Sequence, residues 1–161
     1  MEATNNYNFM NKKTVAISGG FDPIHIGHIE LMKEAKDLGD KLVVIVNNDN
    51  WLTQKKGFVF MNEKERKAII EAVRYVDEVV VTSHPKNPTD MSVCEELKKI
   101  HPDIFANGGD RDKKDADNSN SSLNPEQALC QKLGIELVFN VGKSGKIQSS
   151  SELVKKIKEK K

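Results

Sequence analysis

The sequence predicts an α/β protein with a Rossmann-like five-stranded parallel sheet and helices on both faces. Short runs of β-branched and other apolar residues alternate with segments whose apolar residues recur at helical spacing. Glycine turns directly follow two of the predicted strands, at 19–20 and 107–111. With 161 residues the chain has room for one such domain, so we expect a flexible leader over 1–12 and a single domain over 13–161.

Each element is predicted by its own pattern. Strands are nearly continuous apolar runs, as is typical of parallel strands covered on both faces, and they are expected at 14–18, 41–49, 76–82, 103–106 and 135–139. Helices have one apolar face and, in several cases, a capping residue, and they are expected at 29–38, 62–74, 91–100, 124–133 and from 149 or 150 onward. Segment 51–60 lacks a clear period and is predicted to be a loop over the site. Segment 112–122 is charged and polar and is predicted to be a mobile loop.

The amino-acid composition of the chain limits the kinds of partner that we expect it to bind. Lys and Arg number 25 against 24 Asp and Glu, so a net charge of +1 provides no global field for nucleic acid or an anionic membrane. The Asn-rich leader lacks the features of a signal peptide, and no apolar run reaches membrane-spanning length, so we expect a cytoplasmic protein. Cys94 and Cys130 are isolated, which favours buried reduced thiols over a zinc site.

The most informative stretch is the decapeptide that runs from Gly19 to His28, between the first strand and the first helix. A glycine turn at the end of a parallel strand lets the backbone approach a ligand closely. His25 and His28 would bring two ring N–H donors to the positive end of the helix, and Gly27 leaves a flat patch for a nucleoside. We interpret the stretch as a nucleotide-phosphate cradle; the alternative is a histidine pair that caps an ordinary helix. Its candidate residues are His25 and His28 for catalysis and Gly19, Gly20, Phe21, Asp22 and Gly27 for nucleotide binding.

This stretch resembles the Gly-x-Phe-Asp-x-x-His-x-Gly-His signature of a nucleotidyltransferase superfamily. Its members include glycerol-3-phosphate cytidylyltransferase, heptose-phosphate adenylyltransferase and archaeal FAD synthase. The resemblance implies transfer of a nucleoside monophosphate from CTP or ATP to a phosphorylated acceptor, with release of pyrophosphate. It also implies a Rossmann-like fold and, commonly, a homodimer.

Two further stretches are similar to the same superfamily. Lys55-Lys56, Glu65-Arg66-Lys67 and 74–79 resemble the cytidylyltransferases, which implies that Arg66 contacts nucleotide phosphates and that Lys55 or Lys56 contacts the acceptor phosphate. Segment 145–151 resembles the serine-rich motif that opens the last helix, where hydroxyls and free amides suit the leaving phosphates. The remaining candidates are Gly109, Asp110, Ser149, Ser150 and Ser151 for the nucleotide, Asp22, Asn48, Lys55, Lys56 and Arg111 for the acceptor substrate, and Lys55 and Lys56 as additional catalytic residues.

The identity of the base stays open. The arginine that cytidylyltransferases usually carry before the last motif is missing from 141–146, and 107–110 is more similar to the Gly-Gly-Asp of the heptose-phosphate adenylyltransferases. We predict CTP with a small polyol phosphate such as glycerol 3-phosphate; the alternative is ATP with a heptose phosphate or FMN. Another alternative is a non-catalytic nucleotide-binding module. Mg²⁺ is expected on the triphosphate, with no metal site built from the protein.

Overall fold

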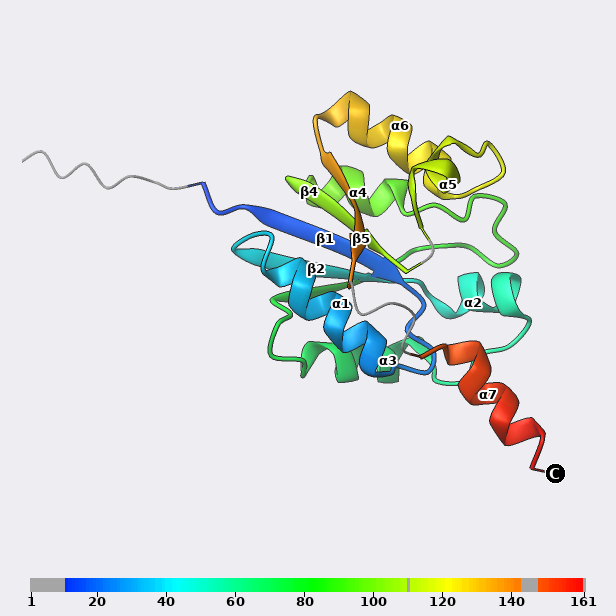
Figure 1. Cartoon of the computed structure of the whole chain (residues 1–161). Helices are drawn as coiled ribbons and strands as arrows, with labels where there is room; N and C mark the ends of the chain where they lie inside the picture. The colour runs from blue at the N-terminus through cyan, green and yellow to red at the C-terminus, as the bar shows by residue number, and fades with distance from the viewer. Residues whose placement is uncertain (1–10, 110, 143–147, 161) are drawn as a thin grey trace, which may run out of the picture.

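The fold is a single parallel sheet with helices on both faces (Figure 1). The computed structural model describes residues 11–109, 111–142 and 148–160. Within these residues five strands pair in the order β3-β2-β1-β4-β5, and each pairing is parallel. The strands are β1 (Thr14–Gly19), β2 (Lys41–Val46), β3 (Glu78–Val81), β4 (Ile104–Gly108) and β5 (Glu136–Val141). The predicted fold class is confirmed.

Two apolar clusters attach helices to the two faces of the sheet. Val15 and Ile17 of β1 pack with α1 and α3 on one face, whereas Ala16 packs with α4, α5 and α6 on the other. Alternate residues of a strand point to opposite faces, so the apolar run of β1 supports both layers. The helices are α1 (Ile26–Lys36), α2 (Asp49–Lys56), α3 (Glu63–Glu71), α4 (Cys94–Ile100), α5 (Lys113–Asp117), α6 (Leu123–Leu133) and α7 (Ser150–Lys158).

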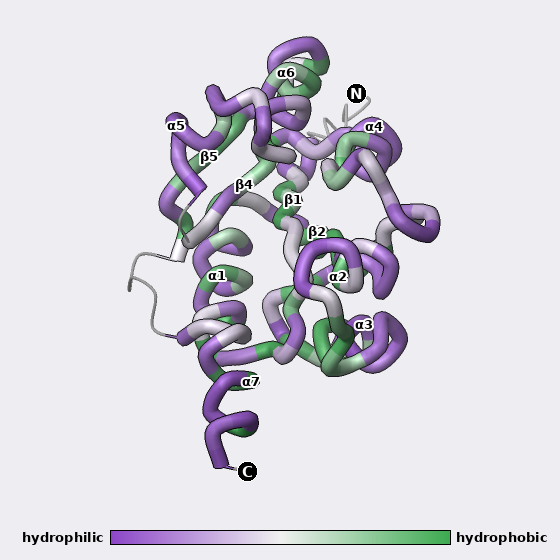
Figure 2. Tube along the Cα trace, turned by 90° about the vertical axis from the view of Figure 1, so that its right-hand side faces the viewer, coloured by the Kyte–Doolittle hydropathy of each residue, from purple (hydrophilic) through white to green (hydrophobic). Residues whose placement is uncertain are grey.

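Helix α7 differs from the helices that cover the sheet. It extends away from the body of the molecule (Figure 1), and its trace is largely hydrophilic (Figure 2). Val154 is its buried residue, and the side chains from Lys155 to Lys160 are exposed. The start of α7 lies at the sheet edge described below, and further along the helix Nζ of Lys158 lies 5.3 Å from the centroid of the Phe58 ring.

The order of the strands creates a crevice at one edge of the sheet. The chain leaves β1 toward β2 and β3 on one side, and later returns to β4 and β5 on the other side. Ligands of open parallel sheets bind outside the carboxyl ends of the strands at such a switch point. The glycine turns that follow β1 and β4 lie at this point, as the sequence predicted.

The predicted loop over 51–60 is wrong for its first part, because α2 occupies Asp49–Lys56. The side chain of Asn48 accepts a hydrogen bond from the N–H of Trp51 at 3.0 Å, and Gly57 ends the helix in the left-handed region with φ of 80°. Trp51 and Leu52 are the buried residues of α2. Two adjacent buried residues in a helix of two turns produce no repeating pattern, which is why the period was invisible in the sequence.

The predicted mobile loop over 112–122 is also partly wrong, because it contains α5. Asp112 caps this helix by accepting the N–H of Asp115 at 3.0 Å, and Ala116 is fully buried against the second apolar cluster. The two cysteines, predicted as buried reduced thiols, are both free: Cys130 is buried as predicted, whereas Cys94 is only partly buried. None of the described helices has the length and apolar character that crossing a membrane would need.

Candidate active site

A cavity of about 350 Å³ opens at the switch point between β1 and β4. Its walls come from the end of β1, the turn into α1, Lys56 of α2, the ends of β4 and β5, and the start of α7. Segments that are far apart in the sequence therefore meet at one edge of the sheet. Of the predicted site residues, the cavity is lined by Gly19, Phe21, His25, Gly27, His28, Lys56, Gly109, Arg111, Ser149, Ser150 and Ser151.

The two histidines form a stacked pair at the start of α1. Their ring centroids lie 3.7 Å apart with an angle of 24° between the ring planes. The N–H of Gly27 donates to Nδ1 of His25, and the N–H of His25 donates to Nδ1 of His28, each at 3.2 Å. Because each Nδ1 accepts a hydrogen bond, a neutral ring carries its proton on Nε2. Neither Nε2 has a partner among the described residues, so both rings offer an N–H donor.

Both rings are held in the neutral form. Burial, followed by the nearby His25 and Lys56, lowers the pKa of His28 to about 3. The pKa of His25 is lowered as well, mainly by burial and then by Lys56. An imidazole that stays neutral donates one N–H and keeps the tautomer that its backbone contact sets. The helix-capping alternative and the cradle interpretation are therefore compatible, since capping uses Nδ1 and leaves Nε2 available.

Phe21 and Gly27 hold this pair in place. Phe21 takes a left-handed backbone conformation with φ of 51°, and its buried ring meets His28 edge-on with centroids 5.0 Å apart. A Cβ at position 27 would lie 3.1 Å from Nδ1 and Cε1 of His25. Glycine at this position therefore leaves room for the His25 ring itself, in addition to any room that it leaves for a ligand.

The third motif forms the N-terminus of α7 beside the turn that follows β1. Ser149 caps the helix, and the hydroxyl of Ser150 donates to the carbonyl oxygen of Pro23 at 2.8 Å. That contact joins the last helix to the histidine turn, although the two residues are 127 positions apart in the sequence. Ser149, Ser150 and Ser151 thus bring hydroxyls and the positive end of a helix dipole to the cavity. Residues 143–147 of this motif region, and Asp110 of the second glycine turn, lie outside the described residues.

The structure separates the two candidate lysines. Lys56 lines the cavity with its Nζ 3.4 Å from the carbonyl oxygen of Asp22, and its pKa is lowered, chiefly by burial. Lys55 is exposed and lies instead beside a neighbouring hollow with Phe58 and residues of α7. Only Lys56 of this pair is placed to act in the cavity.

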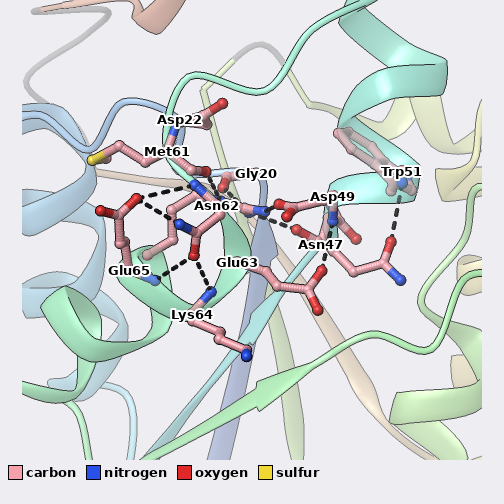
Figure 3. A network of polar contacts seen from close by, with 12 residues as sticks. Gly20, Asp22, Asn47, Asp49, Trp51, Met61, Asn62, Glu63, Lys64 and Glu65 are labelled. Atoms are coloured by element: carbon pink, nitrogen blue, oxygen red, sulfur yellow. Dashed lines mark hydrogen bonds and ion pairs between the residues drawn. The ribbon is translucent and has the colours of Figure 1, made fainter.

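Arg66 requires a correction, because the structure buries it at the junction of two strand ends. Figure 3 shows its partners Gly20, Asn47 and Asp49 close together. Its side chain is 0% exposed. Nη1 donates to the carbonyl oxygens of Gly20 and Asn47 at 2.7 and 2.6 Å, and Nε donates to that of Met61 at 2.9 Å. Nη2 forms an ion pair with Asp49 at 2.6 Å. The prediction that Arg66 contacts nucleotide phosphates is therefore not supported, and Arg66 joins the ends of β1 and β2 instead.

Asp22 likewise binds other parts of the protein and does not line the cavity. The residue is 1% exposed, and its carboxylate accepts the N–H groups of Phe60 and Met61, both at 2.7 Å. Figure 3 shows it beside Met61, close to the strand ends that Arg66 joins. Asp22 therefore fixes the segment between α2 and α3 against the histidine turn.

Asn48 and Gly20 are likewise structural. Asn48 caps α2 with its oxygen, and its amide nitrogen donates to the carbonyl oxygen of His84 at 2.9 Å. A Cβ at Gly20 would lie 2.8 Å from Cδ2 of Leu52, so glycine there permits α2 to pack against the turn. Neither residue lines the cavity. Their predicted ligand contacts lack support.

The described lining of the cavity favours an anion. It contains two cationic residues, Lys56 and Arg111, and no carboxylate. Asn107 also lines the cavity, although the sequence analysis did not select it; its place at the carboxyl end of β4, before two glycines, was the available signal. Leu31 lines the cavity from α1 and carried no such signal, since its pattern is that of an ordinary core residue.

Comparison with known proteins gives relatives of several activities. FAD synthase from Pyrococcus abyssi is 42% identical over 99 residues, which cover 61% of this chain and 64% of that protein. Glycerol-3-phosphate cytidylyltransferase from Bacillus subtilis is 46% identical over 68 residues, which cover 42% of this chain and 53% of that protein. Each match spans less than two thirds of the relative's length.

A solved structure agrees with the fold. The lipopolysaccharide core biosynthesis protein from Thermoplasma volcanium superimposes with a TM-score of 0.62 and 27% identity, over 80% of this chain and 94% of that one. A family model described as cytidylyltransferase-like matches residues 16–156, a range that begins in β1, ends in α7 and includes the cavity. The histidine turn, the switch-point cavity and this match lead to one conclusion: the chain belongs to the cytidylyltransferase-like family.

Proposed function

We propose that this protein is a nucleotidyltransferase that works in the switch-point cavity. The observation that supports it best is the stacked pair of neutral histidines, each held by a backbone N–H on Nδ1 and each with an Nε2–H that has no partner among the described residues. Two fixed, uncharged N–H donors in a cavity without a described carboxylate suit the phosphates of a nucleotide.

The reaction would need positioning and charge stabilisation more than covalent chemistry. An oxygen of the acceptor phosphate attacks the α-phosphorus, the bond to the bridging oxygen breaks, and pyrophosphate leaves. Charge grows on the oxygens around the α-phosphorus, where the two Nε2–H groups would donate hydrogen bonds. Each such donor is worth about a hundredfold to a thousandfold in rate. A phosphate acceptor is already ionised at neutral pH, so no general base is required.

The remaining lining residues would hold the rest of the nucleotide. Lys56 carries positive charge beside the histidines, and the N-terminus of α7 with Ser149 and Ser150 would receive the leaving phosphates. The described lining of the cavity contains no carboxylate, so these residues would not form a complete set of ligands for Mg²⁺. Mg²⁺ would therefore arrive on the triphosphate, where it would neutralise part of the charge on the leaving group.

We infer that ATP and FMN are the substrates, in place of the CTP and polyol phosphate that the sequence analysis put first. The FAD synthase match supports this choice, because it covers 61% of the chain against 42% for the cytidylyltransferase. The missing arginine before the last motif and the Gly-Gly-Asp sequence at 108–110 favour ATP over CTP. CTP with glycerol 3-phosphate is the second candidate, since the cytidylyltransferase is 46% identical over its shorter match.

Turnover with paired substrates tests this proposal. We expect pyrophosphate and FAD from ATP, Mg²⁺ and FMN, and at least tenfold slower pyrophosphate release from CTP with glycerol 3-phosphate or from ATP with a heptose phosphate. His28→Ala should lower kcat by about a hundredfold or more, because one N–H donor to the transition state is lost. Its circular dichroism and melting temperature serve as the folding control.

Three outcomes would change the proposal. Faster turnover with CTP and glycerol 3-phosphate would favour the second candidate. Nucleotide binding without pyrophosphate release from any of the three substrate pairs would favour the non-catalytic module. A folded His28→Ala variant with unchanged kcat would remove the role assigned to the histidine pair.

A further inference from the structure

Arg111 enters the cavity from the chain that leaves β4. Its side chain is 35% exposed, and it is one of the two cationic residues in the described lining. Its Nη2 donates to the hydroxyl of Ser122 at 3.1 Å. Its Nη1 lies 3.4 Å from Oε2 of Glu126. A guanidinium has five N–H donors, so this arrangement leaves donors for a ligand.

Glu126 holds this arginine from inside the protein. It lies in the first turns of α6, and its side chain is 2% exposed. Oε1 accepts the N–H of Val93 at 2.9 Å, which fixes the carboxylate against the segment before α4. Oε2 is left for Arg111. Helices α5 and α6, which frame this contact, lie on the far side of the sheet from α1 and its histidines (Figure 1).

A buried carboxylate in this position needs a physical explanation. Removing a carboxylate from water is costly, and burial raises the pKa of Glu126 to about 7 while Arg111 opposes that shift. Arg111 is the cation within ion-pair distance of Glu126 among the described residues. The contact therefore compensates the glutamate and at the same time limits where the guanidinium can go.

We propose that Glu126 is a positioning residue that holds Arg111 at the wall of the cavity, so that the free guanidinium donors bind an anionic group of the nucleotide or of its acceptor. The inference rests on the proposed function, because it takes the cavity to be the substrate site. The chemistry is that of arginine with phosphate: a planar fork of donors recognises phosphate oxygens best when its orientation is already set. Glu126 itself touches no substrate and acts through Arg111.

Glu126→Gln is the informative variant. A glutamine keeps the volume and can still accept the Val93 N–H, but its uncharged amide no longer attracts the guanidinium. We expect KM for the nucleoside triphosphate or for the acceptor to rise about tenfold, with kcat changed less than about twofold, because binding is weakened and the histidine pair is untouched. The dissociation constant for each substrate, measured by calorimetry, should rise in parallel for the substrate that Arg111 contacts.

Glu96→Gln is a matched control. Glu96 is also a buried glutamate, at 4% exposure, and it also accepts a backbone N–H, from Ser83, but it does not line the cavity or contact Arg111. We expect its KM values to match those of the unmodified protein. A rise of KM in Glu96→Gln equal to that in Glu126→Gln would show that loss of any buried glutamate has this effect, and would overturn the inference.

A double variant separates positioning from a merely structural role. Arg111→Gln should raise KM and also lower the melting temperature, since it leaves the Glu126 carboxylate buried without its cation. The double variant Arg111→Gln/Glu126→Gln should have a higher melting temperature than Arg111→Gln alone, because the buried charge is removed. Its KM should equal that of Arg111→Gln. A further severalfold rise of KM in the double variant would mean that Glu126 does not act through Arg111.

The outcomes also distinguish this inference from the proposed function. If the unmodified protein neither binds nor turns over any of the substrates, the proposed function fails and this inference fails with it. If the unmodified protein is active and Glu126→Gln has unchanged KM values and dissociation constants, only the role of Glu126 is refuted.

Discussion

Single residues in this protein can have a structural role and a role in the candidate active site at once, because different atoms of one side chain carry the two roles. Nδ1 of His25 and of His28 accepts a backbone N–H and shapes the start of α1, while Nε2 has no partner in the part of the chain that the structure describes. Lys56 and Lys55 are neighbours in the chain, yet only Lys56 lines the cavity. The role of a residue here depends on which atom faces the cavity as much as on its type.

The protonation of His28 is a direct prediction of this geometry. With its pKa lowered to about 3, the ring should show no titration between pH 5 and 8, and its Nε2 should carry the proton. Nitrogen chemical shifts of histidine-labelled protein measure both properties. A His28 midpoint near 6.5 would contradict the neutral-donor arrangement.

The same lowered pKa has a consequence for stability. The unfolded chain binds a proton at His28 near pH 6.5, whereas the folded chain binds it only near pH 3. The stability that depends on the neutral ring is therefore fully present above pH 6.5 and is lost as the pH falls toward 3. The fall in melting temperature from pH 7 to pH 5 should accordingly be smaller in His28→Ala than in the unmodified protein.

At the scale of elements, the contacts of Arg66 and Asp22 tie α2 and α3 to the sheet edge. Arg66, from α3, reaches the ends of β1 and β2, and Asp22 holds the segment that precedes α3. These contacts explain why two residues that resemble ligand-binding positions are nearly inaccessible. They fix the turn on which the histidine pair depends.

Arg66→Met should therefore act on stability first. The variant leaves Asp49 without its ion-pair partner and three carbonyl oxygens without donors, and we expect the free energy of unfolding to fall by about 3 kcal/mol. Urea denaturation measures this change. Lys67→Met, at a partly exposed neighbour on the same helix, should change it by less than about 0.5 kcal/mol. Unchanged stability of Arg66→Met together with lost nucleotide affinity would return Arg66 to the phosphate site.

At the scale of the whole molecule, the site exists only where separate segments meet. The ends of β1 and β4, Lys56, and the start of α7 each supply part of the cavity wall, and Ser150 connects α7 to the turn after β1. A ligand in this cavity would contact elements on both sides of the switch point. Its binding energy would then add to the stability of the complete fold.

Nucleotide binding should accordingly raise the melting temperature of the full chain. A ligand at a hundred times its dissociation constant adds about 2.7 kcal/mol to the stability. We expect a larger shift with ATP and Mg²⁺ than with CTP and Mg²⁺ at equal concentration, as the proposed substrates require. Thermal denaturation of both samples provides the comparison, with AMP as a control that lacks the leaving phosphates. A larger shift with CTP would reverse the choice of base.

Local patterns were sufficient for most of the fold. Apolar runs located the strands, and the spacing of apolar residues located α1, α3, α4 and α6 to within a few residues. The patterns failed at α2 and α5, where one or two buried residues hold a short helix. In such helices the tertiary contacts supply the stability, so neither length nor period reveals them.

The sequence by itself determined the order of the strands along the chain, the positions of most helices, the histidine turn and the glycine turns, because each depends on residues close together in the chain. Only the tertiary structure decided that Arg66, Asp22 and Asn48 support the fold, that Lys56 and not Lys55 faces the cavity, and that Glu126 reaches Arg111. The physical reason is burial: whether a charged side chain meets a ligand or a carbonyl oxygen depends on elements distant in the chain, which no local pattern records.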